Sequence, residues 1–130
     1  MKSADLHQIW SAPDNSRLTA KQQSFRLPVH VAAKLEALVV LFPNKTKTQI
    51  VADLLNAALE ELIPNLPSKR GAFFGEHPED GKLYVEEGVC AEFRRLTNKH
   101  FKDLERELGT KNPPDYYTGD YVVSEKDSEV

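Results

Sequence analysis

The sequence predicts a mainly α-helical fold with a short β ribbon, followed by a small α+β unit that consists of a β-hairpin and a helix. Residues 22–27 alternate polar and apolar side chains, which is typical of a half-buried strand. Apolar residues then recur at spacings of three and four in two successive segments, as in amphipathic helices. Residues 64–71 contain two prolines, a serine and a glycine and indicate a linker. Beyond it follow two short strand patterns and a third helical pattern.

The composition, 40% hydrophobic and 28% charged residues, is typical of a soluble globular protein. The longest apolar run, residues 38–43, is too short to span a bilayer, and the first ten residues lack the apolar core of a signal peptide. We therefore expect a cytoplasmic protein without a membrane partner. Cys90 is the only cysteine, which excludes a disulfide within the chain and a zinc site built from thiolates. We interpret it as a small apolar helix residue, and we expect no metal and no cofactor.

The charges of the chain are unevenly distributed. Residues 1–50 contain seven Lys and Arg against three Asp and Glu, a net charge of +4. Residues 51–130 contain ten against seventeen, a net charge of −7. This asymmetry favours an anion-binding front part and a rear part with another task.

Residues 21–63 are predicted to form a strand followed by two helices. Pro28 ends the strand, because proline cannot donate to a ladder, and its fixed backbone angle suits the start of the first helix, Val29–Phe42. Pro43 breaks this helix. Residues 46–49, with the sequence TKTQ, are then typical of a capping box at the start of the second helix.

The predicted strand needs a partner from a second chain. Its alternation places Gln22, Ser24 and Arg26 on one face and Phe25 and Leu27 on the other. A single six-residue strand is not stable alone, and two helices cannot cover the broad apolar face of the second one. An intertwined homodimer solves both problems, because two antiparallel strands then cover four helices and expose six polar side chains.

Residues 21–63 resemble the ribbon-helix-helix DNA-binding proteins, a family that includes the Arc and methionine repressors. The resemblance rests on the R-L-P strand end, the strand-to-helix spacing and the capped second helix TKTQIVADLLNAAL, and it covers about a third of the chain. The alternation Gln-x-Ser-x-Arg is similar to the Arc type of ribbon. The resemblance implies an obligate intertwined dimer that inserts its ribbon into the DNA major groove. One departure is Phe42-Pro43-Asn44, which replaces the glycine usual in the turn between the helices.

Two groups of residues are expected to contact double-stranded DNA. A two-stranded ribbon fits the major groove, where arginine pairs with guanine, glutamine pairs with adenine and serine is less selective. The predicted base contacts are Gln22, Ser24 and Arg26. Backbone N–H groups and the positive end of the dipole at a helix start bind phosphates. The predicted phosphate contacts are Lys45, Thr46, Lys47 and Thr48.

The rear part is predicted to be an accessory unit. Its strands are expected at Ala72–Phe74 and Lys82–Val85 and its helix at Val89–Leu108. The acidic composition after the two prolines at 113 and 114 favours disorder. The predicted organisation is a flexible arm (1–20), a ribbon-helix-helix domain (21–63), a linker (64–71), an accessory hairpin and helix (72–109) and a mostly disordered acidic tail (110–130).

Some rear residues could suggest an enzyme, but none forms a convincing catalytic set. His77 beside Glu76, Glu79 and Asp80 has the composition of an ordinary turn. The basic residues of the third helix are interleaved with acidic ones, and we interpret them as a solvated face with ion pairs: Arg94, Arg95, Lys99, Lys102 and Arg106. We therefore expect no enzymatic activity.

Together these patterns predict a sequence-specific, dimeric DNA-binding transcriptional regulator, with repression by promoter occlusion as the expected mode. The alternative is an antitoxin-like interaction protein that autoregulates its operon and binds a partner protein through residues 72–109. The accessory unit could also join dimers on DNA or bind an effector.

Overall fold

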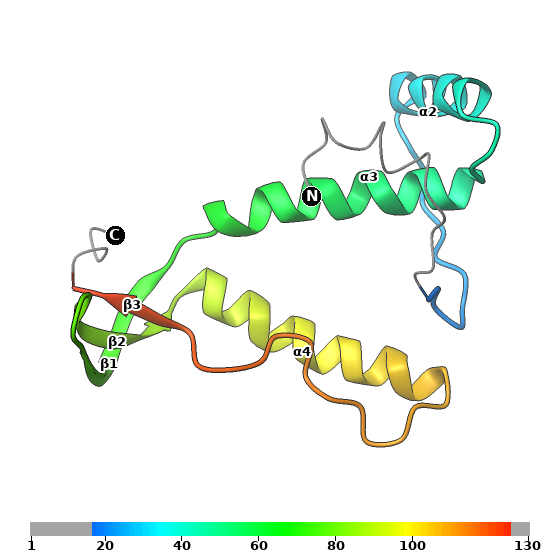
Figure 1. The fold of residues 1–130 in the computed structure, drawn as a ribbon. Coiled ribbons are helices and arrows are strands. Elements are labelled where there is room, and N and C mark those ends of the chain that lie inside the picture. Colours follow the sequence, from blue (N-terminus) through cyan, green and yellow to red (C-terminus); the bar gives the residue numbers. More distant parts are fainter. Residues whose placement is uncertain (1–16, 126–130) are drawn as a thin grey trace. The chain divides into compact units, whose positions relative to one another are not determined.

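The computed structural model describes residues 17–125, which form three α-helices, a short 3₁₀ turn and a three-stranded antiparallel sheet (Figure 1). This α+β mix contains more sheet than the mainly helical fold predicted from the sequence. Two compact units follow each other along the chain, a front unit up to Pro64 and a rear unit from Asn65 onward. Their boundary falls in the 3₁₀ turn η2 (Ile63–Asn65). Most of the predicted N-terminal arm, residues 1–16, lies outside the described residues.

The front unit contains helix α2 (Val29–Leu41) and helix α3 (Lys47–Leu62), which confirms both helices predicted for this region. α2 begins directly after Pro28, whose carbonyl oxygen accepts hydrogen bonds from the N–H groups of Val31 and Ala32, both at 3.0 Å. Pro28 is the N-cap residue, with φ −54° and ψ 146°, so it lies just outside the helix, where its missing N–H interrupts no helical hydrogen bond.

A small aliphatic core joins the two helices of the front unit. Leu35 from α2 is 7% exposed, and Ile50 and Ala57 from α3 are completely buried. Partly buried side chains surround these three: Leu38, Val39, Phe42, Val51 and Leu54. The core contains only residues on one stripe of each helix, as the spacings of three and four require.

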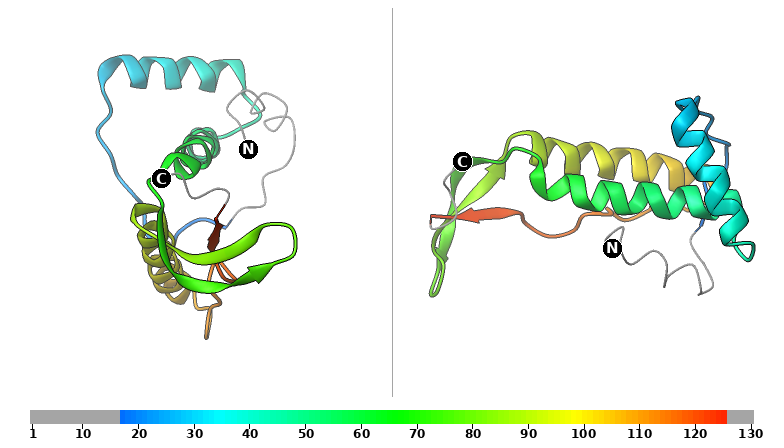
Figure 2. Two further views of the ribbon diagram at one scale, coloured as in Figure 1. Left: turned by 90° about the vertical axis from the view of Figure 1, so that its left-hand side faces the viewer. Right: turned by 90° about the horizontal axis from the view of Figure 1, so that it is seen from above.

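The rear unit is built on a sheet with strand order β1-β2-β3. β1 (Lys69–His77) pairs antiparallel with β2 (Gly81–Glu87), and β2 pairs antiparallel with β3 (Val122–Ser124) (Figure 2). The register of the hairpin shifts twice, on either side of Phe73, so β1 carries two bulges. Bulges increase the local twist of a strand pair and are frequent at sheet edges such as this one.

The hairpin is longer than predicted and includes the end of the predicted linker, residues 64–71. Lys69 pairs across the ladder with Glu87, and Arg70 pairs with Glu86. Opposite charges directly across a strand pair stabilise it, so these positions belong to the sheet although proline and glycine nearby suggested a linker.

Helix α4 (Val89–Glu107) follows β2 and confirms the third predicted helix. Gly88 joins strand and helix with a φ of 92°, a left-handed conformation that favours glycine. The N–H of Cys90 donates to the carbonyl of Pro67 at 2.9 Å and so fixes the start of the helix to the residues before β1. No helix within residues 17–125 is both long and apolar enough to cross a membrane.

The prediction of a mostly disordered tail from residue 110 is wrong for residues 110–125. Residues 110–121, the return segment, run back beside α4 and lead into β3 (Figure 1). Asn98 fixes this segment, because its side chain accepts from the N–H of Tyr117 at 2.8 Å and donates to its carbonyl at 3.1 Å. Acidic composition suggested disorder, but Tyr116 packs on Phe101 and Tyr117 on Phe93, with ring centroids 5.4 and 6.4 Å apart.

Candidate nucleic-acid interface

The three predicted base-contact residues, Gln22, Ser24 and Arg26, all lie exposed on the segment that precedes α2. Within residues 17–125 this segment pairs with no strand and has no regular secondary structure. Its apolar residues are exposed too, since Phe25 is 75% and Leu27 46% accessible. The structure thus brings the three polar residues onto one short exposed segment and leaves the two apolar ones uncovered.

The start of α3 carries the predicted capping box. The Thr46 side-chain oxygen accepts from the N–H of Gln49 at 3.1 Å, and the Gln49 side-chain oxygen accepts from the N–H of Thr46 at 2.8 Å. The sequence predicted the N–H of Thr46 as a phosphate donor, but in the structure this N–H already donates to Gln49. The N–H groups of Lys47 and Thr48 have no acceptor among the described residues and remain the donors of the helix start.

The two lysines of this region differ in their surroundings. The ammonium group of Lys47 forms an ion pair with Glu36 of α2, and both side chains are more than half exposed. Such exposed pairs contribute only about 0–1 kcal/mol, so a phosphate can replace the carboxylate. The backbone N–H of Lys45 donates to the carbonyl of Phe42 at 3.1 Å and closes the turn between the helices.

The described part of the front unit is basic up to residue 52, in the second turn of α3. Residues 17–52 contain six cationic residues and one anionic residue, Glu36. The cations are Arg17, Lys21, Arg26, Lys34, Lys45 and Lys47. This local excess is the electrostatic property that a phosphate backbone requires, and the net charge of −3 for the whole chain conceals it.

The front unit also exposes much apolar surface. Val29 is 88%, Val40 79% and Leu41 69% accessible. Further exposed large apolar residues of this unit are Phe25, Leu27, Val31, Leu55, Leu59 and Leu62. Exposed apolar surface on this scale is unusual for a monomeric domain.

Sequence reasoning missed a polar cluster in the rear unit, centred on Arg94. Its guanidinium donates to Glu86 at 2.6 Å and to the sulfur of Cys90 at 2.9 Å, and it lies 3.9 Å from the ring centroid of Tyr121. The Arg94 and Glu86 side chains are only 11% and 12% exposed, so Arg94 does not belong to the solvated face predicted for this helix. The helical spacing of Cys90, Arg94 and Asn98 was the signal that could have placed it on the buried side.

The environment of this cluster shifts two pKa values. Burial acts to raise the pKa of Glu86, but hydrogen bonds from Ser68 and Arg94 outweigh it and hold that pKa below its ordinary value. Burial and the neighbouring Glu86 raise the pKa of the Cys90 thiol. Of Glu86 and Cys90, Glu86 is therefore the group that carries the negative charge, and Cys90 stays a protonated, unreactive thiol.

Other rear residues have local structural roles. Nδ1 of His77 accepts from the N–H groups of Glu79 and Asp80, both at 3.2 Å, and so closes the hairpin turn. On α4, Arg95 pairs with Glu92 and Arg106 with Asp103, as expected for a solvated face. Among residues 17–125 no group of three or more His, Cys, Asp or Glu could hold a metal ion.

Comparison with family models, curated proteins and solved structures finds no match for this chain. The function is therefore inferred from the residues and their geometry.

Proposed function

We propose that the chain is a sequence-specific DNA-binding regulator of the ribbon-helix-helix type, which acts as a homodimer and represses transcription by occluding promoters. The observation that carries the proposal is the exposed, unpaired segment 22–27 directly before a pair of helices whose apolar surface is incompletely covered. In the proposal the apolar side chains of this segment pack in the dimer core, and its polar side chains contact DNA.

A second copy supplies what the front unit lacks. Segment 22–27 offers backbone donors and acceptors that have no ladder partner within residues 17–125, and an antiparallel twin satisfies them. Pairing also places Phe25 and Leu27 of both copies over the helices. The exposed side chains of α3, Leu55, Leu59 and Leu62, then pack against the other copy.

The polar face of the resulting ribbon reads bases in the major groove. Arg26 donates two hydrogen bonds to guanine, Gln22 pairs with the edge of adenine, and Ser24 makes a shorter, less selective contact. The start of α3 holds a phosphate through the N–H groups of Lys47 and Thr48 and the positive end of the helix dipole. Lys45 adds positive charge, and Lys47 does so when it exchanges Glu36 for the phosphate.

The proposal is tested by measuring binding of the full chain to an operator that is selected from a random DNA pool. Replacement of Arg26 by alanine should weaken binding to this operator by at least about thirtyfold, because the dimer loses two bidentate contacts that each contribute about 1–3 kcal/mol of discrimination. Binding to random DNA should fall much less, because only one phosphate-attracting charge per chain is lost.

Lys34→Ala is the matched control, since it removes an exposed cation of α2 that has no base-reading role in the proposal. It should weaken binding to both DNAs by a similar, small factor. Equal losses on operator and random DNA for Arg26→Ala would contradict base readout by the ribbon, and failure to select any preferred sequence would contradict the regulator itself.

A further inference from the structure

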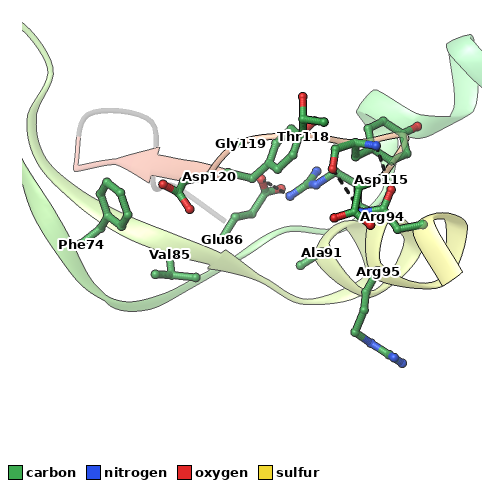
Figure 3. Close-up of a pocket in the computed structure, with 13 residues that line it drawn as sticks. Phe74, Val85, Glu86, Ala91, Arg94, Arg95, Asp115, Thr118, Gly119 and Asp120 are labelled. Atoms are coloured by element: carbon green, nitrogen blue, oxygen red, sulfur yellow. Dashed lines mark hydrogen bonds and ion pairs between the residues drawn. The ribbon is translucent and has the colours of Figure 1, made fainter. Parts of the chain in front are cut away.

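The rear unit contains an open cleft of about 470 Å³ between the sheet, α4 and the return segment (Figure 3). This volume lies within the range of roughly 300–1,000 Å³ that is usual for small-molecule sites. The apolar residues of the lining are Phe74, Val85 and Ala91, and Figure 3 shows Phe74 and Val85 together at the end of the cleft away from Arg94. Phe74 is 48% and Val85 38% exposed, so this end offers apolar surface that the rear unit itself does not cover.

The charged groups around the cleft are neutralised in pairs, with one exception. Arg94 pairs with Glu86, Asp115 with Lys102, and Arg95 with Glu92. Asp120 is the exception, because its exposed carboxylate has no hydrogen bond or ion pair with any of the residues 17–125. Figure 3 shows this carboxylate on the side of the cleft where Phe74 and Val85 lie.

The cleft wall contains two cations, Arg94 and Arg95. Figure 3 shows the Arg95 side chain directed away from the other lining side chains, and Arg94 is not free to hold an anion. The two terminal nitrogens of Arg94 already donate to Glu86 and Cys90, and Tyr121 covers its face. A neutral ligand would take water away from Asp120 without supplying a counter-charge, which is unfavourable. A ligand with a positive charge pairs with Asp120, and an apolar body attached to that charge covers Phe74 and Val85.

We infer that this cleft binds a primary ammonium group on an apolar stem, with Asp120 as the counter-ion and Phe74 and Val85 in contact with the stem. Aromatic rings attract cations, and the cleft lining includes those of Phe74, Tyr117 and Tyr121. A free alkylamine and a lysine side chain of another protein share this chemistry. The inference concerns the rear unit alone and is independent of DNA binding by the front unit.

The test is a titration of the full chain with pentylammonium, followed by the backbone amide signals in NMR spectra. We expect saturable shifts that are confined to residues lining the cleft. Pentanol, which has the same stem without the charge, should cause much weaker shifts. Asp120→Asn should weaken pentylammonium binding about twofold to fivefold, the range expected for one exposed ion pair.

Asp103→Asn is the matched control, because Asp103 is an exposed carboxylate of the same unit that does not line this cleft. The affinity of the Asp103→Asn variant for pentylammonium should equal that of the unaltered chain. An N-acetylated lysine amide distinguishes a lysine side chain of a partner protein from a free alkylamine as the ligand. If it binds as tightly as pentylammonium or more tightly, the ligand is a lysine of a partner. If it binds more weakly, the ligand is a free amine. Unchanged binding in Asp120→Asn, equal binding of pentanol, or the absence of saturable shifts would overturn the inference.

Discussion

The front unit is held together by aliphatic packing between two helices, whereas the rear unit is held by hydrogen bonds, an ion pair and aromatic contacts around a small sheet. In the front unit the completely buried side chains are Ile50 and Ala57, and neither is polar. In the rear unit the central contacts are the pair of Glu86 with Arg94 and the two hydrogen bonds between Asn98 and Tyr117.

This difference determines what each unit depends on. Apolar contacts are not directional, so the front unit can complete its core with identical surface from a second copy. Hydrogen bonds and ion pairs are directional, and a partner removed from a buried pair leaves an unsatisfied charge. The front unit should therefore respond to protein concentration, and the rear unit to single polar substitutions and to pH.

The largest effect is expected for Arg94→Met in the rear unit. The substitution leaves the nearly buried Glu86 carboxylate without its partner and removes the stack on Tyr121. Loss of one member of such a pair costs about 3–5 kcal/mol. Amide hydrogen exchange of β2 and α4 measures this loss within the rear unit. Arg95→Met, which breaks the exposed pair with Glu92, is the control and should leave the exchange of both elements almost unchanged.

Acid provides a second readout of the same pair. Because the folded-state pKa of Glu86 lies below its ordinary value, its ionisation stabilises the folded rear unit fully above pH about 4.3, the ordinary pKa of glutamate. That contribution is lost as the pH falls through the lower pKa of the folded state. Arg94→Met should remove this part of the acid dependence. An identical acid profile in both proteins would show that Glu86 does not depend on Arg94.

The next effect concerns concentration and distinguishes the front unit from the rear. If two copies complete one front core, each tenfold dilution should lower the stability of the dimer by about 1.4 kcal/mol. Amide exchange of α2 and α3 should then accelerate on dilution, while that of β2 and α4 stays constant. Sedimentation at the same concentrations should show dimers that dissociate over this range. Exchange in α2 and α3 that is independent of concentration would contradict the dimer.

The sequence predicts the local elements of the chain better than its contacts. The three helices follow from apolar spacing and from the capping box at Thr46, because both signals depend on neighbours along the chain. β3 was missed because three residues in an acidic tail form a strand only when β2 offers its edge. Arg94 was misplaced because its contacts with Glu86 on β2 and Tyr121 in the return segment depend on how these elements pack against α4.

The candidate interface shows the same limit at the level of single groups. The sequence predicts that Lys45, Thr46, Lys47 and Thr48 lie together at a helix start, and the structure places them there. It does not predict that Glu36, from the preceding helix, pairs with Lys47, because that contact depends on how α2 packs against α3. The pair makes Glu36 a competitor of the phosphate in the proposed complex.

The smallest effect is therefore expected for Glu36→Gln, and its direction is a gain of function. The substitution releases Lys47 and removes the one anionic residue among residues 17–52, so DNA affinity should rise, by less than about fivefold because exposed ion pairs are weak. Affinity for operator and random DNA should rise alike, since phosphates and not bases are contacted. Glu60→Gln is the control, because it makes the same change of charge on α3 about 20 Å from Lys47. At that distance salt screens the effect of the carboxylate on a phosphate bound at the helix start. Salt titrations of both variants measure the difference, and equal gains would mean that net charge alone, without release of Lys47, controls affinity.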